Sequence, residues 1–195
     1  MKRLLIAILL TLPLLAAPTQ AQTTEEQHLE FMGIPMEGSI NAFAQKLQAK
    51  GMKIINREDN IITLSGTFAG ANDCYIDILE TPKKEIWRVG VSSFNYTWET
   101  LSGRYFRWKE MLTQKYGEPL TCTEEFQTTY PPDSDAMRWH YVNSGKCNYR
   151  STFLAENGYI ILTIMKIRYN KNYVGIIYTD WINEQKMEDS AMDDL

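Results

Sequence analysis

The residues best suited to chemistry in this chain are a histidine and a cysteine that lie close together. His140 precedes Cys147 by seven residues with a turn between them, so the two side chains could face each other across a hairpin. A thiol beside an imidazole base is an arrangement that nucleophilic hydrolases use. The alternative is that His140 lies on the surface of a strand without a catalytic partner. A hydrolase that uses His140 with Cys147 or with a carboxylate is therefore one hypothesis.

Motifs for other catalytic chemistry are missing from the sequence. The two histidines, His28 and His140, are not part of an H-E-x-x-H pattern, and no paired C-x-x-C is present. Asp133-Ser134-Asp135 has acidic spacing but lacks the glycine and the final glutamate of a calcium loop. Neither a G-x-S-x-G motif nor a glycine-rich phosphate loop occurs. The sequence predicts no catalytic residue, no metal site and no cofactor.

Aromatic residues are the more informative group. The chain has 5 Trp, 11 Tyr and 7 Phe, and several of them have no obvious place in a buried core. Exposed tyrosine and tryptophan provide rigid contact surface for a protein or a carbohydrate. The alternative is that these residues are strand formers that pack on their neighbours. The candidate ligand-binding residues are Tyr96, Tyr130, Trp139, His140, Tyr169 and Tyr173.

The three cysteines, Cys74, Cys122 and Cys147, cannot all pair within one chain. In an oxidising compartment, a Cys122–Cys147 disulfide would close a loop of a length that contributes roughly 2–4 kcal/mol in many proteins. The alternative is that all three are buried as small apolar residues.

The N-terminus has the layout of a secretory signal peptide. Lys2 and Arg3 precede an apolar run over residues 4–15, and small residues lead up to a cleavage point after Ala21. A membrane anchor is disfavoured because this run is too short to span a bilayer comfortably. We therefore expect residues 1–21 to be removed, leaving a periplasmic or extracellular protein with no transmembrane segment.

The charge of the chain disfavours two classes of partner. The formal net charge is −4, and it becomes −6 once the two basic residues of the signal peptide are removed. No cluster of Lys and Arg stands out, so nucleic acid and anionic membranes are poor candidates as partners.

A helix over residues 98–116 is predicted to organise the fold. Its large apolar residues recur in steps of three and four, and Gly117 and Pro119 follow as helix-ending residues. A shorter helix is predicted between Ser39 and Gly51. The residues of the central apolar stripe are Trp98, Leu101, Tyr105, Trp108, Leu112 and Tyr116.

The apolar period changes to two outside these helices, which predicts strands. The expected strands are 53–57, 61–68, 74–79, 87–94, 122–129, 137–142, 147–155, 159–169 and 173–179. Residues 22–30 are expected to form a flexible leader, and residues 181–195 a short helix or an acidic, fraying tail. The fold class is therefore α+β, with an antiparallel β-meander sheet and helices packed on one face.

Residues 31–195 are expected to form a single α+β domain, with two repeated halves over 31–95 and 96–180 as a further hypothesis. Val89 and Val91 follow Cys74 at the offsets at which Leu162 and Ile164 follow Cys147. The alternative is coincidence, because strand alternation has only two phases.

The segments Gly33-Ile34-Pro35 and Gly38-Ser39, with the helix and strands that follow, resemble the opening of small bacterial envelope modules. These include the outer-membrane-assembly lipoprotein type and the β-lactamase-inhibitor-protein type. The resemblance covers the helix-plus-meander unit alone, and the lipidated cysteine of the lipoprotein type is missing. The whole chain, including its last residues 191–195, is similar to uncharacterised exported proteins of gut anaerobes. Neither resemblance supplies catalytic residues.

Together these observations favour a secreted or periplasmic, non-enzymatic binding module that holds a protein or a glycan on its open sheet face or on its loops. The hydrolase described above is the first alternative. A structural envelope protein that self-associates through an edge strand is the second.

Overall fold

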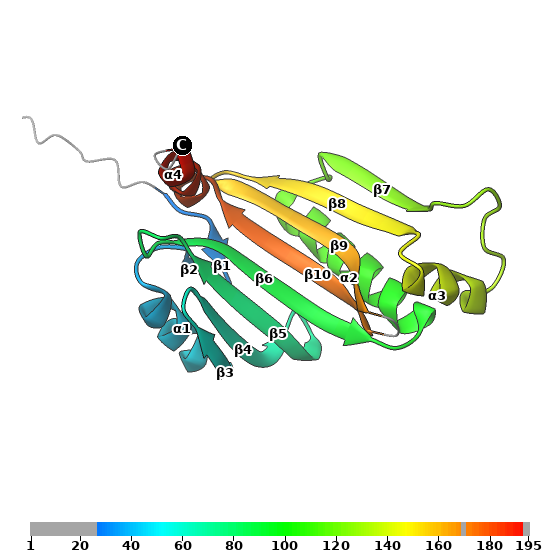
Figure 1. The fold of residues 1–195 in the computed structure, drawn as a ribbon, viewed down its shortest axis with the longest axis horizontal. Helices are drawn as coiled ribbons and strands as arrows, with labels where there is room; N and C mark the ends of the chain where they lie inside the picture. Colours follow the sequence, from blue (N-terminus) through cyan, green and yellow to red (C-terminus); the bar gives the residue numbers. More distant parts are fainter. Residues whose placement is uncertain (1–26, 169–170, 193–195) are drawn as a thin grey trace, which may run out of the picture.

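The structure is a computed structural model that describes residues 27–168 and 171–192. The expected signal peptide lies outside the described residues. The main feature is an eight-stranded antiparallel sheet (Figure 1), in which the strands follow the order β3-β4-β5-β6-β10-β9-β8-β7. The strands are β3 (Lys53–Glu58), β4 (Ile61–Phe68), β5 (Ala71–Glu80), β6 (Ile86–Asn95), β7 (Thr121–Phe126), β8 (Cys147–Ala155), β9 (Gly158–Arg168) and β10 (Lys171–Asp180). The predicted α+β class with an antiparallel meander is confirmed.

The two halves of the sheet are built from the same order of elements. Helix α1 (Ile40–Ala49) precedes β3 to β6, and helix α2 (Trp98–Tyr116) precedes β7 to β10. Helix α3 (Asp135–Asn143) is inserted between β7 and β8. The last strand of each half, β6 and β10, pair with each other at the centre of the sheet.

This strand order shows that Cys74 and Cys147 are not equivalent positions of the two halves, as the repeat hypothesis had assumed. Cys74 lies on β5 and Cys147 on β8, whereas the counterpart of β5 in the second half is β9. The matching offsets therefore relate strands that are not equivalent in the two halves. Such a match can arise by coincidence, because side chains alternate between the two faces on every strand.

The predicted central helix is confirmed. The Thr97 hydroxyl accepts a hydrogen bond from the Thr100 N–H at the start of α2, and Gly117 follows the helix with a positive φ of 85°. The helix buries its apolar stripe on the sheet together with α1. The fully buried Tyr105 also donates or accepts a hydrogen bond of 2.8 Å with the Ser151 hydroxyl of β8.

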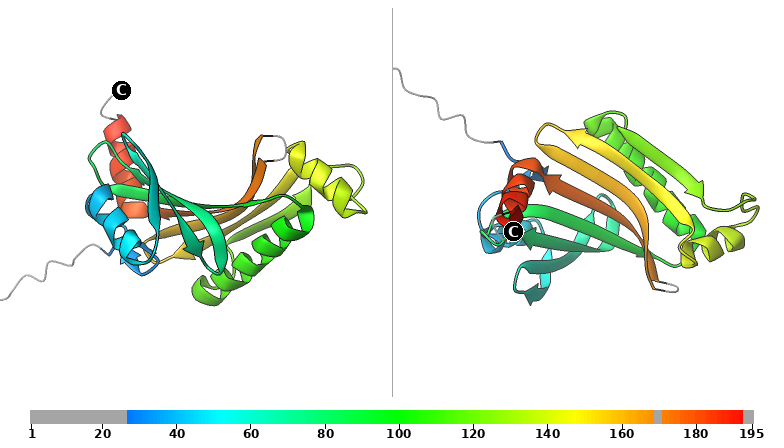
Figure 2. Two further views of the ribbon diagram at one scale, coloured as in Figure 1. Left: turned by 90° about the horizontal axis from the view of Figure 1, so that it is seen from below. Right: turned by 45° about the horizontal axis from the view of Figure 1, so that its top comes forward.

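Helices α1 and α2 lie against the convex face of the curved sheet (Figure 2). The opposite face is concave, and helix α4 (Trp181–Met192) stands at one end of it. The helix alternative for the C-terminal segment is thus confirmed over these residues. None of the described helices is both long and apolar enough to cross a membrane.

The strand expected over residues 137–142 is wrong, because these residues belong to α3. The Ser134 hydroxyl accepts the Met137 N–H at 3.3 Å and so caps this helix. The alternating apolar residues imitated a strand, but Trp139 and Val142 are three residues apart and both pack against the core. Helical spacing and a serine cap therefore outweigh the apparent alternation.

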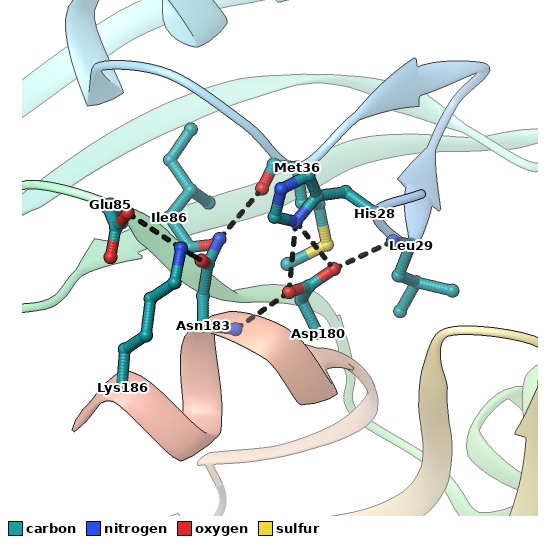
Figure 3. A network of polar contacts seen from close by, with 8 residues as sticks. All are labelled: His28, Leu29, Met36, Glu85, Ile86, Asp180, Asn183 and Lys186. Atoms are coloured by element: carbon teal, nitrogen blue, oxygen red, sulfur yellow. Dashed lines mark hydrogen bonds and ion pairs between the residues drawn. The ribbon is translucent and has the colours of Figure 1, made fainter. Parts of the chain in front are cut away.

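The flexible leader is also wrong for its described residues, 27–30. Asp180, at the end of β10, is completely buried and accepts the backbone N–H of Leu29 at 2.7 Å and that of Asn183 at 2.9 Å. His28 Nδ1 lies 3.2 Å from both oxygens of the same carboxylate (Figure 3). One buried side chain thus ties the N-terminal segment to the start of α4.

The neighbouring segments complete this anchor. Strands β1 (Glu30–Phe31) and β2 (Ile34–Pro35) form a small antiparallel ribbon. The Asn183 side chain donates to the carbonyl oxygens of Met36 and Ile86 at 3.1 and 2.9 Å (Figure 3). The ribbon, β6 and α4 are therefore held together by hydrogen bonds that are inaccessible to water.

Candidate ligand-binding site

Three aromatic side chains form a row across neighbouring strands on the concave face. Tyr75 of β5 lies against Phe94 of β6, with ring centroids 5.6 Å apart, and Phe94 lies against Tyr173 of β10 at 5.4 Å. Phe94 and Tyr173 are direct partners in the strand pairing, while Tyr75 is paired with Ser92. Cross-strand aromatic neighbours of this kind contribute roughly 0.2–1 kcal/mol per pair to a sheet.

Tyr96, just beyond the end of β6, lines the same hollow as the row and is 74% exposed. We call Tyr75, Phe94, Tyr96 and Tyr173 the aromatic cluster. The hollow has a volume of about 450 Å³, which is within the range of small-ligand sites. Its other lining residues are Thr63, Asp77, Ser92, Ile167 and Lys171.

Beside the hollow, the backbone of the central strand β6 is not covered by a side chain at Gly90. Gly90 of β6 is paired with Asp77 on β5, and a Cβ atom added at Gly90 would meet nothing within 4 Å. Glycine in a strand interior weakens the strand and often marks a place where a ligand or another backbone approaches closely. The strand interior is thus open next to the aromatic cluster.

A second glycine fixes one of the rings. A Cβ atom added at Gly175 of β10 would lie 3.1 Å from a carbon of the Tyr173 ring, so this ring covers the glycine. The Tyr173 hydroxyl also donates to the Met165 sulfur at 3.1 Å. Tyr173 is therefore held in place by contacts along its length, as a binding residue needs to be.

The hollow contains one carboxylate and one ammonium group. The Asp77 carboxylate accepts the Thr63 hydroxyl at 2.7 Å, and the Lys171 ammonium lies 5.1 Å from the centroid of the Phe94 ring. Among the described residues, neither charge takes part in an ion pair. Burial, and secondly the negative charge of Asp77, raises the pKa of Tyr173, so its hydroxyl stays neutral at physiological pH.

The structure brings two of the predicted binding residues together, namely Tyr96 and Tyr173. Tyr130 lies elsewhere, beside Tyr141 in a shallow hollow formed by the loop after β7. Trp139 is half-buried and packs against the core, and His140 is exposed on α3. Tyr169 lies outside the described residues.

Among the residues that sequence reasoning missed are Tyr75, Asp77 and Phe94, which line the hollow, and Gly90, which is paired with Asp77 beside it. Each lies in the solvent-facing phase of a strand whose other phase is buried against the helices. Tyr75 between the buried Cys74 and Ile76 is one such signal, because an aromatic in the outward phase has no core to fill.

Among the described residues, no hydrogen bond or ion pair joins the His140 ring to Cys147 or to a carboxylate. The His140 ring lies 5.8 Å from the Tyr141 ring on the same helix. Burial raises the pKa of the Cys147 thiol to about 12, so the thiol is protonated at neutral pH. A reactive cysteine requires the opposite shift, since the thiolate is the nucleophile.

The Cys122–Cys147 disulfide is not formed, and all three cysteines are free. In the β7–β8 pairing Cys122 lies opposite Ser151, and Cys147 lies opposite Phe126. The two cysteines are thus separated by four strand positions, or roughly 13 Å along the strand. A disulfide requires Cα atoms within about 7 Å, so this register excludes it.

A larger hollow of about 780 Å³ lies between the β1–β2 ribbon and the end of α2. It is lined mainly by polar residues, among them Glu30, Glu37 and Glu156. Gln27, the first described residue, lies at its border. No cluster of aromatic rings from the described part of the chain lines this hollow, in contrast to the hollow on the concave face. Within residues 27–168 and 171–192, no group of three or more His, Cys, Asp or Glu could hold a metal ion.

No family model, curated protein or solved structure matches this chain. The resemblance to bacterial envelope modules therefore stays a prediction, and function has to be argued from the site itself.

Proposed function

We propose that this protein is a non-enzymatic binding module that holds its ligand on the concave face of the sheet, at the aromatic cluster. The observation that carries the proposal is the hollow in which Tyr75, Phe94, Tyr96 and Tyr173 gather beside the open backbone of Gly90. Rigid, partly exposed aromatic side chains are the residues that contribute most to recognition.

The shape of the sheet supports the same proposal. A concave face offers a ligand contact from several strands at once, and rigid strands hold binding side chains more accurately than loops do. The signal-peptide pattern of the sequence supports a place in the periplasm or outside the cell, where the partner would be met.

The hydrolase that would use His140 with Cys147 or a carboxylate has less support. His140 is exposed, its ring lies against Tyr141, and the Cys147 thiol is protonated at neutral pH. It stays a prediction that is ranked below binding.

Site-specific photo-cross-linking tests the proposed function. Tyr96 is replaced by p-benzoylphenylalanine, a photoreactive residue of similar shape, and intact cells of the source organism are irradiated. We expect a specific adduct at this position. The matched control is the same replacement at Tyr130, which is 79% exposed against 74% for Tyr96 but lines a separate hollow, formed by the loop after β7. Equal labelling at both positions, or none at Tyr96, would contradict the proposal.

A further inference from the structure

The charges of the hollow restrict the ligand that it can take. Asp77 and Lys171 line the same hollow, and no described residue neutralises either of them in an ion pair. Because one carboxylate and one ammonium group line it, the hollow has no net charge that would favour an anionic or a cationic ligand. A neutral ligand that both donates and accepts hydrogen bonds satisfies the two charged groups at once.

Hydroxyl groups line the rest of the hollow. The side chains of Tyr75, Ser92 and Tyr96 have no hydrogen-bond partner among the described residues, so each can donate one hydrogen bond and accept another from a ligand. The Thr63 hydroxyl donates to Asp77, which orients that carboxylate and leaves it further acceptor positions.

The aromatic rings supply the third element of recognition. Tyr75 is 39% exposed and Tyr96 is 74% exposed, and Phe94 joins Tyr75 to Tyr173 in a continuous apolar row. Neighbouring rings of the row are inclined to each other, by 81° between Tyr75 and Phe94 and by 50° between Phe94 and Tyr173, so a ligand would stack on the face of one ring at a time. The face of an aromatic ring beside polar groups suits a ligand that has an apolar face and a polar rim. A sugar ring has this form, with C–H bonds on its face and hydroxyls around its edge.

From these three features we infer that the ligand of the concave face is a saccharide without charged groups. Its ring stacks on the aromatic cluster, its hydroxyls donate to the Asp77 carboxylate, and other hydroxyls accept from the Lys171 ammonium. The inference rests on the proposed binding function and specifies the ligand class for the same site. Binding is reversible and no bond is made or broken.

Isothermal titration calorimetry tests the inference with the purified mature chain. The probes are maltotriose, cellotriose, xylotriose, mannotriose, laminaritriose and chitotriose. We expect at least one of them to bind with a Kd below about 1 mM. Because the ligand is neutral, we expect the Kd to stay within about twofold as NaCl rises from about 0.05 to about 0.5 M.

Substitutions connect this binding to the site. Phe94→Leu removes the central ring, and Asp77→Asn removes the charge while an amide oxygen can still accept from Thr63. Each is expected to weaken binding at least about tenfold. Tyr96→Ala is expected to have a similar effect and cannot unfold the protein through a cavity, since this side chain is 74% exposed. The matched control is Tyr130→Ala, which should leave the Kd unchanged.

The outcomes separate the ligand class from the binding function itself. If none of the six saccharides binds, the inference is overturned. If instead poly-lysine or heparin binds and Tyr96→Ala abolishes this binding, the concave face is a binding site for a charged partner. The saccharide is then wrong and the proposed function stands. If no probe binds and position 96 gives no specific cross-link, both fail.

Discussion

Phe94 and Tyr173 face each other across the central strand pair of the sheet, with ring centroids 5.4 Å apart. Phe94 belongs to β6, the last strand of the first half, and Tyr173 belongs to β10, the last strand of the second half. The candidate site is therefore built across the line where the two halves meet. Tyr75, Phe94 and Tyr96 come from the first half and Tyr173 from the second, so neither half contains the whole aromatic cluster on its own.

This pair predicts a modest effect on stability. Tyr173→Leu removes the ring contact with Phe94 and uncovers Gly175, so we expect the free energy of unfolding to fall by about 1 kcal/mol. Equilibrium unfolding in urea, followed by circular dichroism, measures the change. Tyr130→Leu, at an exposed loop position, should stay within about 0.5 kcal/mol of the wild type. An equally small effect of both variants would contradict a structural role for the pair.

The hydrogen bond between Tyr105 and Ser151 predicts a second, non-additive effect. Both residues are completely buried, so Tyr105→Phe leaves the Ser151 hydroxyl without this partner, and we expect a loss of about 1–2 kcal/mol. Ser151→Ala should cost a similar amount for the same reason. The double variant should lose about 1 kcal/mol less stability than the sum of the losses in the two single variants. Strict additivity in urea unfolding would show that the two hydroxyls do not interact.

The buried carboxylate of Asp180 predicts the largest loss of stability. Asp180→Ala leaves the Leu29 N–H without its acceptor and removes the cap of α4, so we expect a loss of about 2–4 kcal/mol. Thermal unfolding and limited proteolysis of the N-terminal segment measure it. Asp189→Ala, which changes an exposed carboxylate on the same helix, is the control and should have little effect. Unchanged protease resistance in Asp180→Ala would contradict the anchoring role.

The Cys147 thiol predicts a specific loss of stability at alkaline pH. Its pKa rises from 9.0 to about 12 on folding because burial disfavours the thiolate. Below pH 9 the thiol is protonated in both states, so its contribution to stability is complete. Between pH 9 and about 12 the unfolded chain ionises first and stability falls, by about 1 kcal/mol between pH 9 and pH 10.

Urea unfolding of the wild type and of Cys147→Ala at pH 7, 9 and 10 measures this effect. The variant should lose less stability than the wild type over the alkaline interval, because it has no thiol to ionise. The difference between the two proteins cancels the contribution of the buried tyrosines, which titrate in both. Parallel pH dependences would show that Cys147 is not buried in its protonated form.

The regular elements of the fold were predictable where one apolar period ran without interruption. The stripe from Trp98 to Tyr116 and the cap at Ser39 each follow from local chemistry, and both helices form as expected. Residues 137–142 carry two competing periods. The cap at Ser134 and the helical spacing of Trp139 and Val142 favour the helix, but that both side chains pack against the core is seen only in the folded structure.

The candidate site was predictable only in part. Tyr96 and Tyr173 were identified because a buried role was not evident for them, but their proximity depends on the pairing of β6 with β10. These two strands are far apart in the sequence, and the order of strands in a sheet is not contained in their alternation. The role of Gly90 in the candidate site depends on the empty space above its backbone. This space exists only in the assembled sheet, so the sequence alone does not show it.

The proposed function is tested most directly by filling the space above Gly90 and measuring the yield of the cross-link at position 96. A tryptophan at this position meets no neighbouring atom at its Cβ and suits a strand, so Gly90→Trp should fold with a stability within about 1 kcal/mol of the wild type. Its side chain would stand beside Asp77 and cover that end of the hollow. The matched control is Gly103→Trp, at an exposed position of α2 where an added Cβ also meets nothing within 4 Å.

Each substitution is combined with p-benzoylphenylalanine at position 96, and the yield of the cross-linked adduct is compared. We predict that Gly90→Trp lowers the yield at least about tenfold. Gly103→Trp should leave the yield at the level of the parent protein. An adduct formed equally well in all three proteins would show that the ligand does not occupy the concave face.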